Sequence, residues 1–145
     1  MVNSNSVDIL ARTAWGENRG GGEIGMQSVM NSVLNRVRHG GWWGNTIVGV
    51  CQHPWQYSCW NADSDPNSDY QAMLAVTADD TNFAIALALA GRAIMGTLPD
   101  ITEGADSYYA VSIPPPNWVT GIASENIPPA QFTVEIAGQR FYKTV

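Results

Sequence analysis

The sequence predicts an α+β domain that is led by helices and ends in a small β-hairpin. Two segments near the N-terminus space their apolar residues as amphipathic helices do, and an Ala-rich helical segment follows them. Strand-like runs occur only beyond residue 106, and the last two are separated by Ala137-Gly138. With 145 residues, of which 45% are hydrophobic, the chain is expected to form one domain over residues 1–145.

Apolar stripes define the first two predicted helices. The first is expected to begin at a cap by Asn5 or Ser6 and to end near Glu17, because the glycines at 20–22 cannot sustain a helix. The second ends at the glycine pair 40–41. The stripes consist of Val7, Leu10, Ala11 and Ala14 in the first helix, and of Met26, Val29, Met30, Val33, Leu34 and Val37 in the second.

The middle of the chain alternates between loop and helix. Residues 42–62 show no sustained period and predict a long, aromatic-rich ordered loop, and helices follow over about 68–78 and 81–95. Asp63, Asp65 and Asp69 are spaced as at the start of a calcium loop, but Ser68 and Leu74 stand where that loop needs Gly and Glu. We therefore interpret these acids as the start of a helix.

The last third of the chain predicts strands. Residues 107–111 indicate a strand, and three prolines at 114–116 require an extended loop after it. Residues 133–136 and 139–142 predict the C-terminal hairpin.

The net charge limits the partners of the chain. Seven Lys and Arg against 13 Asp and Glu leave a formal charge of −6, which argues against nucleic acid and anionic membranes as partners. The N-terminus lacks the pattern of a signal peptide, and the longest apolar stretch, 83–90, is too short to cross a bilayer. We expect a monomer that is synthesised in the cytoplasm without a signal peptide and does not insert into the membrane.

Two cysteines leave their own state open. Cys51 and Cys59 are close enough in sequence to close one small loop as a disulfide, and free thiols are the alternative. With His53 they have the wrong spacing for a zinc finger, so no metal and no cofactor are expected.

Glu17 is the acid that capping does not explain. It falls at the C-terminal end of the first predicted helix, where the helix dipole disfavours a carboxylate and favours the protonated form that a general acid needs. Trp15 and an open glycine loop flank it. The alternative is a structural ion pair with Arg19 or Arg12.

Three blocks of sequence resemble the SleB-type cell wall hydrolases, the family of the spore-cortex-lytic enzymes. ARTAWGENRG at 11–20 is similar to that family's LARxxYGEARGE opening. GMQ at 25–27 and VLNRV at 33–37 are similar to its GMQAVANVxLNRV segment, and VCQHPWQYSCWN at 50–61 to its VCxxPxQFSCWN segment. Weaker agreement continues to GQRFY at 138–142, so the resemblance covers nearly the whole chain.

The resemblance implies a compact fold like that of lytic transglycosylases and goose-type lysozyme, and cleavage of peptidoglycan between N-acetylmuramic acid and N-acetylglucosamine. It assigns the catalytic role to Glu17. Gly21 replaces the second Glu of the family motif, and Gln139 replaces the usual His of the last hairpin. A lytic transglycosylase needs only one acid, whereas a hydrolytic muramidase uses a second carboxylate. Candidates for that second group are Glu23, Asp106 and Glu125.

Aromatic and polar residues near these motifs are candidates for substrate binding. Trp60, Tyr108 and Tyr109 could stack on sugar rings, and Gln56 and Ser58 could bind hydroxyl or N-acetyl groups; packing in the core or loop is the alternative for each. Arg19 could orient Glu17 or meet substrate carboxylates. Trp42, Trp43 and Trp118 are expected to be structural anchors.

Other functions remain open at this stage. A zinc amidase would need more histidines than His39 and His53, and a Cys–His amidase would need a nucleophile and base better separated than Cys51 and His53. A non-catalytic glycan-binding module is a third alternative. A bare catalytic domain without a signal peptide suggests a phage endolysin that reaches the wall through a membrane pore.

Overall fold

The computed structural model describes residues 4–61 and 69–145 and places helices before strands. The α-helices are α1 (Ser4–Asn18), α2 (Gly22–His39), α3 (Ile47–Cys51), α4 (Tyr70–Ala75), α5 (Thr81–Ile94) and α6 (Asn117–Thr120). Single 3₁₀ turns are η1 (Arg19–Gly21), η2 (Gly41–Trp43), η3 (Ser58–Trp60) and η4 (Ala123–Glu125). The strands are β1 (Ser107–Ala110), β2 (Gln131–Ile136) and β3 (Gln139–Lys143).

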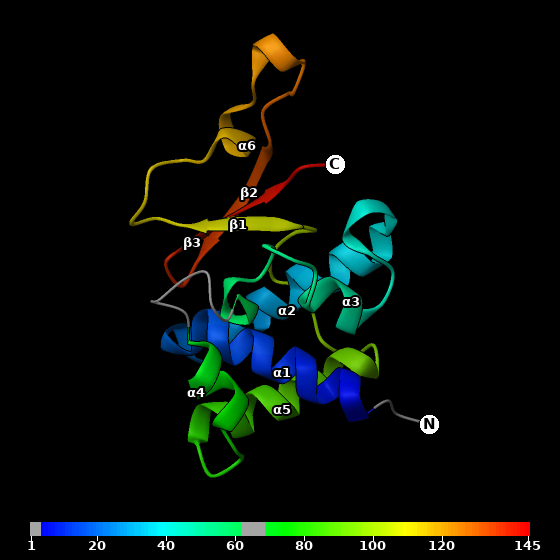
Figure 1. Ribbon diagram of the computed structural model, residues 1–145, viewed down its shortest axis with the longest axis vertical. Coiled ribbons are helices and arrows are strands. Elements are labelled where there is room, and N and C mark those ends of the chain that lie inside the picture. Colours follow the sequence, from blue (N-terminus) through cyan, green and yellow to red (C-terminus); the bar gives the residue numbers. More distant parts are fainter. Residues whose placement is uncertain (1–3, 62–68) are drawn as a thin grey trace.

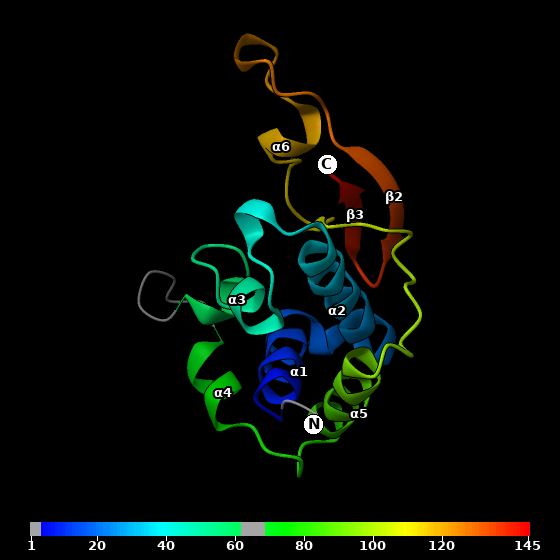
Figure 2. The same cartoon turned by 90° about the vertical axis from the view of Figure 1, so that its right-hand side faces the viewer.

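Helix α1 is the centre of the helical part. It packs against α2, α3, α4 and α5, and the two ribbon views place it among these helices (Figures 1 and 2). The predicted stripes form the core: Leu10, Ala11 and Ala14 of α1 and Met26, Val29, Met30 and Val33 of α2 are fully buried. The small alanines of α1 allow its neighbours to approach closely, which suits a helix that is covered on several sides.

The sheet lies at one end of the helical part and is antiparallel throughout. Its strand order is β1-β3-β2, so the C-terminal hairpin pairs with the earlier strand through β3. Ala137 and Gly138 form the hairpin turn with φ values of +48° and +80°, as a two-residue hairpin turn requires. The turn packs against the junction of α1 and α2, where the Asn18 side chain donates to the Ala137 carbonyl at 3.4 Å. The predicted α+β fold with a C-terminal hairpin is confirmed.

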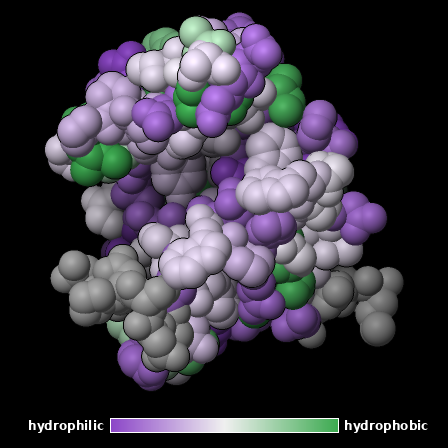
Figure 3. Space-filling model, turned by 45° about the horizontal axis from the view of Figure 1, so that its top comes forward, coloured by the Kyte–Doolittle hydropathy of each residue, from purple (hydrophilic) through white to green (hydrophobic). Residues whose placement is uncertain are grey.

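Residues 111–130 project from the sheet along the long axis of the molecule, and α6 and η4 lie on this projection (Figures 1 and 2). In the space-filling view, one face of the molecule is hollowed across its middle and hydrophilic residues surround the hollow (Figure 3). No helix in the described ranges is long and apolar enough to cross a membrane.

Two asparagines of α2 fix the segment that leads from α5 into β1. Asn31 donates to the Pro99 carbonyl at 3.0 Å and accepts from the N–H of Ile101 at 3.0 Å. Asn35 donates to the Ala105 carbonyl at 2.8 Å. Buried amides that are satisfied by backbone groups specify one position for the chain, so the start of β1 is held against α2.

Some elements differ from the sequence prediction. The expected loop over 42–62 contains α3, which Thr46 caps by accepting from the N–H of Gly49 at 3.0 Å. The first helix begins at Ser4, so the expected caps Asn5 and Ser6 lie inside it. Helix α4 is shorter than the predicted span of 68–78, whereas α5 agrees with the prediction for 81–95. Of the three acids that are spaced as in a calcium loop, Asp63 and Asp65 lie outside the described residues.

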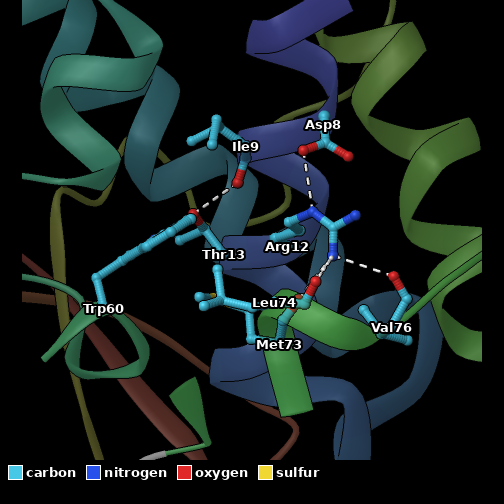
Figure 4. A network of polar contacts seen from close by, with 8 residues as sticks. All are labelled: Asp8, Ile9, Arg12, Thr13, Trp60, Met73, Leu74 and Val76. Atoms are coloured by element: carbon cyan, nitrogen blue, oxygen red, sulfur yellow. Dashed lines mark hydrogen bonds and ion pairs between the residues drawn. The ribbon is translucent and has the colours of Figure 1, made fainter. Parts of the chain in front are cut away.

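Arg12 explains where α4 ends. Its Nη1 donates to the carbonyls of Met73, Leu74 and Val76 at 2.7, 3.3 and 3.0 Å, and its Nε pairs with Asp8 at 2.9 Å (Figure 4). The last carbonyls of a helix have no intrahelical donor, so a guanidinium can replace the missing turn. Helix α4 is thereby attached to α1.

Replacing Arg12 by Ala is expected to lower the free energy of unfolding by about 2 kcal/mol, because charge-assisted hydrogen bonds to several carbonyls are lost. Urea unfolding measures the change. Arg92→Ala is the matched control, since the exposed Arg92 guanidinium donates a long hydrogen bond, 3.4 Å, to the Thr97 carbonyl, and its loss should change stability by at most about 0.5 kcal/mol. Equal losses in the two variants would contradict this account of α4.

Candidate active site

The Glu17 carboxylate is the meeting point of three separate parts of the chain. It lies half-buried near the end of α1. The Tyr108 hydroxyl, from β1, donates to Oε1 at 2.7 Å. The N–H of Cys59 and the hydroxyl of Ser58, from η3, donate to Oε2 at 3.1 and 3.3 Å. Both oxygens are thus oriented by donors, and the group stays partly accessible.

The ion-pair alternative for Glu17 is absent from the described part of the chain. Arg12 pairs with Asp8, and Arg19 pairs with Asp69 at 2.9 Å. Arg19 also lies over the Trp15 ring, with Cζ 4.0 Å from the ring centroid. Neither arginine therefore explains the position of Glu17, and the interaction that we considered between Arg19 and Glu17 is not formed.

A close approach between α1 and η3 brings the Cys59 amide to Glu17. A Cβ atom built on Gly16 would lie 2.7 Å from Cβ and 3.0 Å from Sγ of Cys59, closer than side chains can pack. Only glycine leaves room for η3 at this point of the helix. One turn earlier, Thr13 accepts from the Trp60 indole N–H at 2.9 Å (Figure 4), which fixes the same turn a second time.

The other predicted binding residues are distributed around this site. Ser58 and Tyr108 contact Glu17 directly, as described. Trp60 packs against the core with its N–H satisfied by Thr13, the packing alternative that the sequence left open. Tyr109 lies on the opposite face of β1 from Tyr108, where its ring stacks on Tyr142 at a centroid distance of 5.9 Å.

The candidates for a second carboxylate have different surroundings. Asp106 is 3% exposed, and its carboxylate accepts from the Ser107 hydroxyl and from the backbone and hydroxyl of Thr144. These bonds attach it to the C-terminal residues. Glu23 is exposed in the first turn of α2. Glu125 is exposed in η4, on the projection at the far end of the molecule from α1 (Figures 1 and 2).

A pocket of about 580 Å³ adjoins the site through Tyr108. Gln56 lies in its wall and accepts from Arg36 Nη1 at 3.3 Å. The other lining residues are Arg36, His39, Gly40, Trp42, Trp43, Trp55, Ser107, Trp118, Thr144 and Val145.

Aromatic side chains at this pocket are more exposed than the sequence suggested. Trp42 and Trp55 are 68% and 70% exposed, so the expectation that Trp42 is a structural anchor is wrong. Trp55 was not among the predicted site residues. Its φ of +67° places it in a tight turn. Trp43 is 8% exposed and does anchor the loop. Neither exposure nor backbone turn is visible in the composition of the 42–62 segment, which explains the difference.

Burial determines the state of the tyrosine and thiol groups. Burial raises the pKa of Tyr108 well above its ordinary value, and the negative charge of Glu17 raises it further, so Tyr108 remains a protonated donor. Cys51 and Cys59 are buried free thiols. Burial raises the pKa of Cys51 to about 12 and also raises that of Cys59. Such thiols are poor nucleophiles, which counts against the Cys–His amidase.

Gln139 stands at the position of the family's usual His. Its side chain lies on the same face of β3 as that of Phe141. Its buried Oε1 has no hydrogen-bond partner among the described residues. Within the same residues, no three His, Cys, Asp or Glu side chains gather as metal ligands.

The chain forms a helical domain with a small antiparallel sheet, and the oriented Glu17 carboxylate lies near the end of its central helix. The model of the cell wall hydrolase family matches residues 20–139, and the chain belongs to that family. Glu17 lies just before the matched range. The prediction of a cell wall hydrolase is thereby confirmed.

Two solved structures have a similar fold. The catalytic domain of the germination-specific lytic transglycosylase SleB from Bacillus anthracis superposes with a TM-score of 0.67 at 22% identity, over 97% of this chain and 96% of that one. The catalytic domain of the Bacillus cereus SleB protein gives 0.66 at 22% identity, over 99% and 93%. A comparison with curated proteins gives no match.

Replacing Gly16 by Ala is expected to lower the free energy of unfolding by about 1–3 kcal/mol, because the added methyl group displaces η3. Wall-cleaving activity should fall as well, since η3 supplies two donors to Glu17. Gly91→Ala in α5 is the control: nothing lies within 4 Å of its added Cβ, so helix propensity should raise stability by about 0.5–1 kcal/mol. Stabilisation by both substitutions would refute the close approach.

The native protein is expected to leave both thiols unreacted with a disulfide reagent at mildly alkaline pH, because burial keeps them protonated. After unfolding in guanidinium chloride, two thiols should react. Absorbance of the released chromophore counts them. Rapid reaction in the native state, or no reaction after unfolding, would contradict the buried free thiols.

Proposed function

We propose that this chain is a lytic transglycosylase that cleaves peptidoglycan glycan strands between N-acetylmuramic acid and N-acetylglucosamine, with Glu17 as both acid and base. The observation that supports it is the single carboxylate held by three donors from η3 and β1 beside a pocket. The similarity of the fold to a catalytic domain described as a lytic transglycosylase supports it further.

In the first step, protonated Glu17 donates its proton to the glycosidic oxygen while the bond from that oxygen to muramic C1 breaks. The oxygen of the muramic 2-acetamido group stabilises C1 as positive charge develops there. The carboxylate that remains accepts from Tyr108, Cys59 and Ser58. Hydrogen bonds to the charged form stabilise the product of this proton transfer.

In the second step, the same carboxylate accepts the proton of the muramic C6 hydroxyl. O6 then attacks C1, the acetamido oxygen leaves, and a 1,6-anhydro ring forms. Glu17 is protonated again and no water is consumed. These two steps need one carboxylate. This agrees with the exposed positions of Glu23 and Glu125 and with the attachment of Asp106 to Thr144.

Glu17→Gln is expected to reduce strand cleavage by about 10²–10⁴-fold, because the amide cannot donate and accept the proton. Mass spectrometry of fragments from purified sacculi should find 1,6-anhydromuramic ends with the wild type. Glu135→Gln is the control, since this exposed residue in β2 pairs only distantly, at 3.7 Å, with Arg140. It should retain wild-type cleavage.

Each alternative gives a different product. Reducing muramic ends would identify a muramidase with water as the acceptor and a second carboxylate. Released stem peptides would identify an amidase, and the absence of soluble fragments would indicate a binding module. Full activity of Glu17→Gln would refute the role of Glu17. The route by which the protein reaches the wall stays a prediction.

A further inference from the structure

The pocket beside Tyr108 contains a buried cation that forms no ion pair with a carboxylate of the described residues. Arg36, on α2, is 6% exposed and lies in the pocket wall. Its Nε donates to the Asp106 backbone carbonyl at 2.6 Å and its Nη1 to Gln56 Oε1 at 3.3 Å. Within the described ranges, no carboxylate oxygen lies within 4.0 Å of an Arg36 side-chain nitrogen, the limit for an ion pair. A buried charge is ordinarily paired, so an external anion would complete this site.

The walls of the pocket favour an anion that is attached to a sugar. The guanidinium lies close to two aromatic rings, with Cζ 5.2 Å from the Trp43 centroid and 4.9 Å from that of Tyr57. Among the described residues that line the pocket, Arg36 and His39 have side chains with cationic character, and none is an Asp or a Glu; Val145, the last residue of the sequence, also lines it. The exposed rings of Trp42 and Trp55 add apolar surface at the rim. Sugar rings present apolar C–H faces to such aromatic side chains.

The position of the pocket relative to Glu17 suits a substituent of the muramyl residue. Tyr108 bonds to Glu17 through its hydroxyl, and the same side chain lines the pocket. Gln56 and Ser58 belong to one short segment, which continues from the pocket to Glu17. In the proposed reaction, C1 of the muramyl residue belongs to the glycosidic bond that is cleaved. The lactyl ether is attached to C3 of the same ring. That ether ends in a carboxyl group or continues into the stem peptide.

We propose that Arg36 and the aromatic pocket bind a carboxylate of the muramyl substituent and so select muramyl residues that bear an anionic group. This inference rests on the proposed function, because it places the muramyl C1 at Glu17. Two groups could supply this carboxylate: the free lactyl carboxylate of a residue without a stem peptide, or a carboxylate of the stem peptide. In a residue with a stem, the lactyl carboxyl is an amide and is neutral.

The test is a binding titration of glycan strands to Glu17→Gln, in which cleavage is slow. Strands with intact stems and strands stripped of stems by an amidase are each compared with the same strands after conversion of their carboxyl groups to methyl amides. One charge-assisted hydrogen bond corresponds to about a tenfold preference for the carboxylate form. A preference confined to intact strands identifies the stem as the source, and one confined to stripped strands identifies the lactyl group.

Gln56→Glu in the same background tests the role of Arg36. The new carboxylate would lie where Oε1 now accepts from Arg36, so it pairs with the guanidinium and neutralises the pocket without removing a side chain. The tenfold preference should disappear. Arg36→Gln should have the same effect, but Arg36 also holds the start of β1 through Asp106, so its folding must be verified by circular dichroism.

Arg38→Gln is the matched control. Arg38 is on the same helix and carries the same charge, but it is exposed, donates to Asn35, and lies outside this pocket. Its substitution should leave the preference intact. Equal binding of carboxylate and amide strands to Glu17→Gln would overturn the proposal, and so would loss of the preference in Arg38→Gln to the same extent as in Gln56→Glu.

A different measurement on the same samples, mass spectrometry of the cleavage products, tests the proposed function separately. Mass spectrometry would find undiminished cleavage by Glu17→Gln if Glu17 were not the acid. With that result, the carboxylate preference would be measured from the relative rates at which the carboxylate and amide strands are cleaved. Conversely, normal anhydro products from the wild type together with equal binding of both strand forms would leave the proposed function standing and remove only the anion pocket.

Discussion

The contact between Gly16 on α1 and Cys59 in η3 is the constraint on which the candidate site depends. Without a side chain at residue 16, the turn rests directly on the helix, and the Cys59 amide reaches the Glu17 carboxylate at 3.1 Å. The indole of Trp60 bonds to Thr13 one turn earlier and prevents the turn from sliding along the helix. A backbone amide is a donor that cannot rotate away, so it orients the Glu17 carboxylate better than a flexible side chain does.

The third donor arrives from the sheet, and its position depends on α2. Asn31 and Asn35 hold the segment that enters β1, and the Tyr108 ring then packs against Phe141 of β3 at a centroid distance of 5.2 Å. The Tyr108 hydroxyl can therefore reach Glu17 only when the helical part and the sheet are both in place. The site is thus a product of the contact between the two parts of the molecule, and neither part contains it alone.

The distribution of charge resolves an apparent conflict in the sequence. A chain with a formal charge of −6 is an unusual partner for an anionic polymer. Arg12, Arg19 and Arg140 are engaged with acids of the chain itself. Among the described residues Arg36 has no such partner, and burial of its guanidinium in the pocket wall reduces the screening of its charge by solvent. Local charge rather than net charge would then determine how the wall polymer is bound.

Local patterns in the sequence predict the helical stripes, the C-terminal hairpin and the identity of Glu17 as the acid without a capping role. These features depend on periodicity, turn residues and position in a helix, which are local properties of a chain. The same local reasoning missed α3, because a short helix of β-branched residues has little periodic signal. It also assigned Trp42 to an anchoring role, since a lone sequence does not reveal which face of a loop meets solvent.

The side chains that surround Glu17 are brought together by long-range packing. Its donors come from residues that are 41, 42 and 91 positions away in the chain, and no local pattern reports such distances. The separation of Tyr108 from Tyr109 depends on strand pairing, which sends alternate side chains to opposite faces. Packing also leaves Arg36 without a carboxylate partner among the described residues, and charge composition does not reveal which cations find a partner when the chain folds.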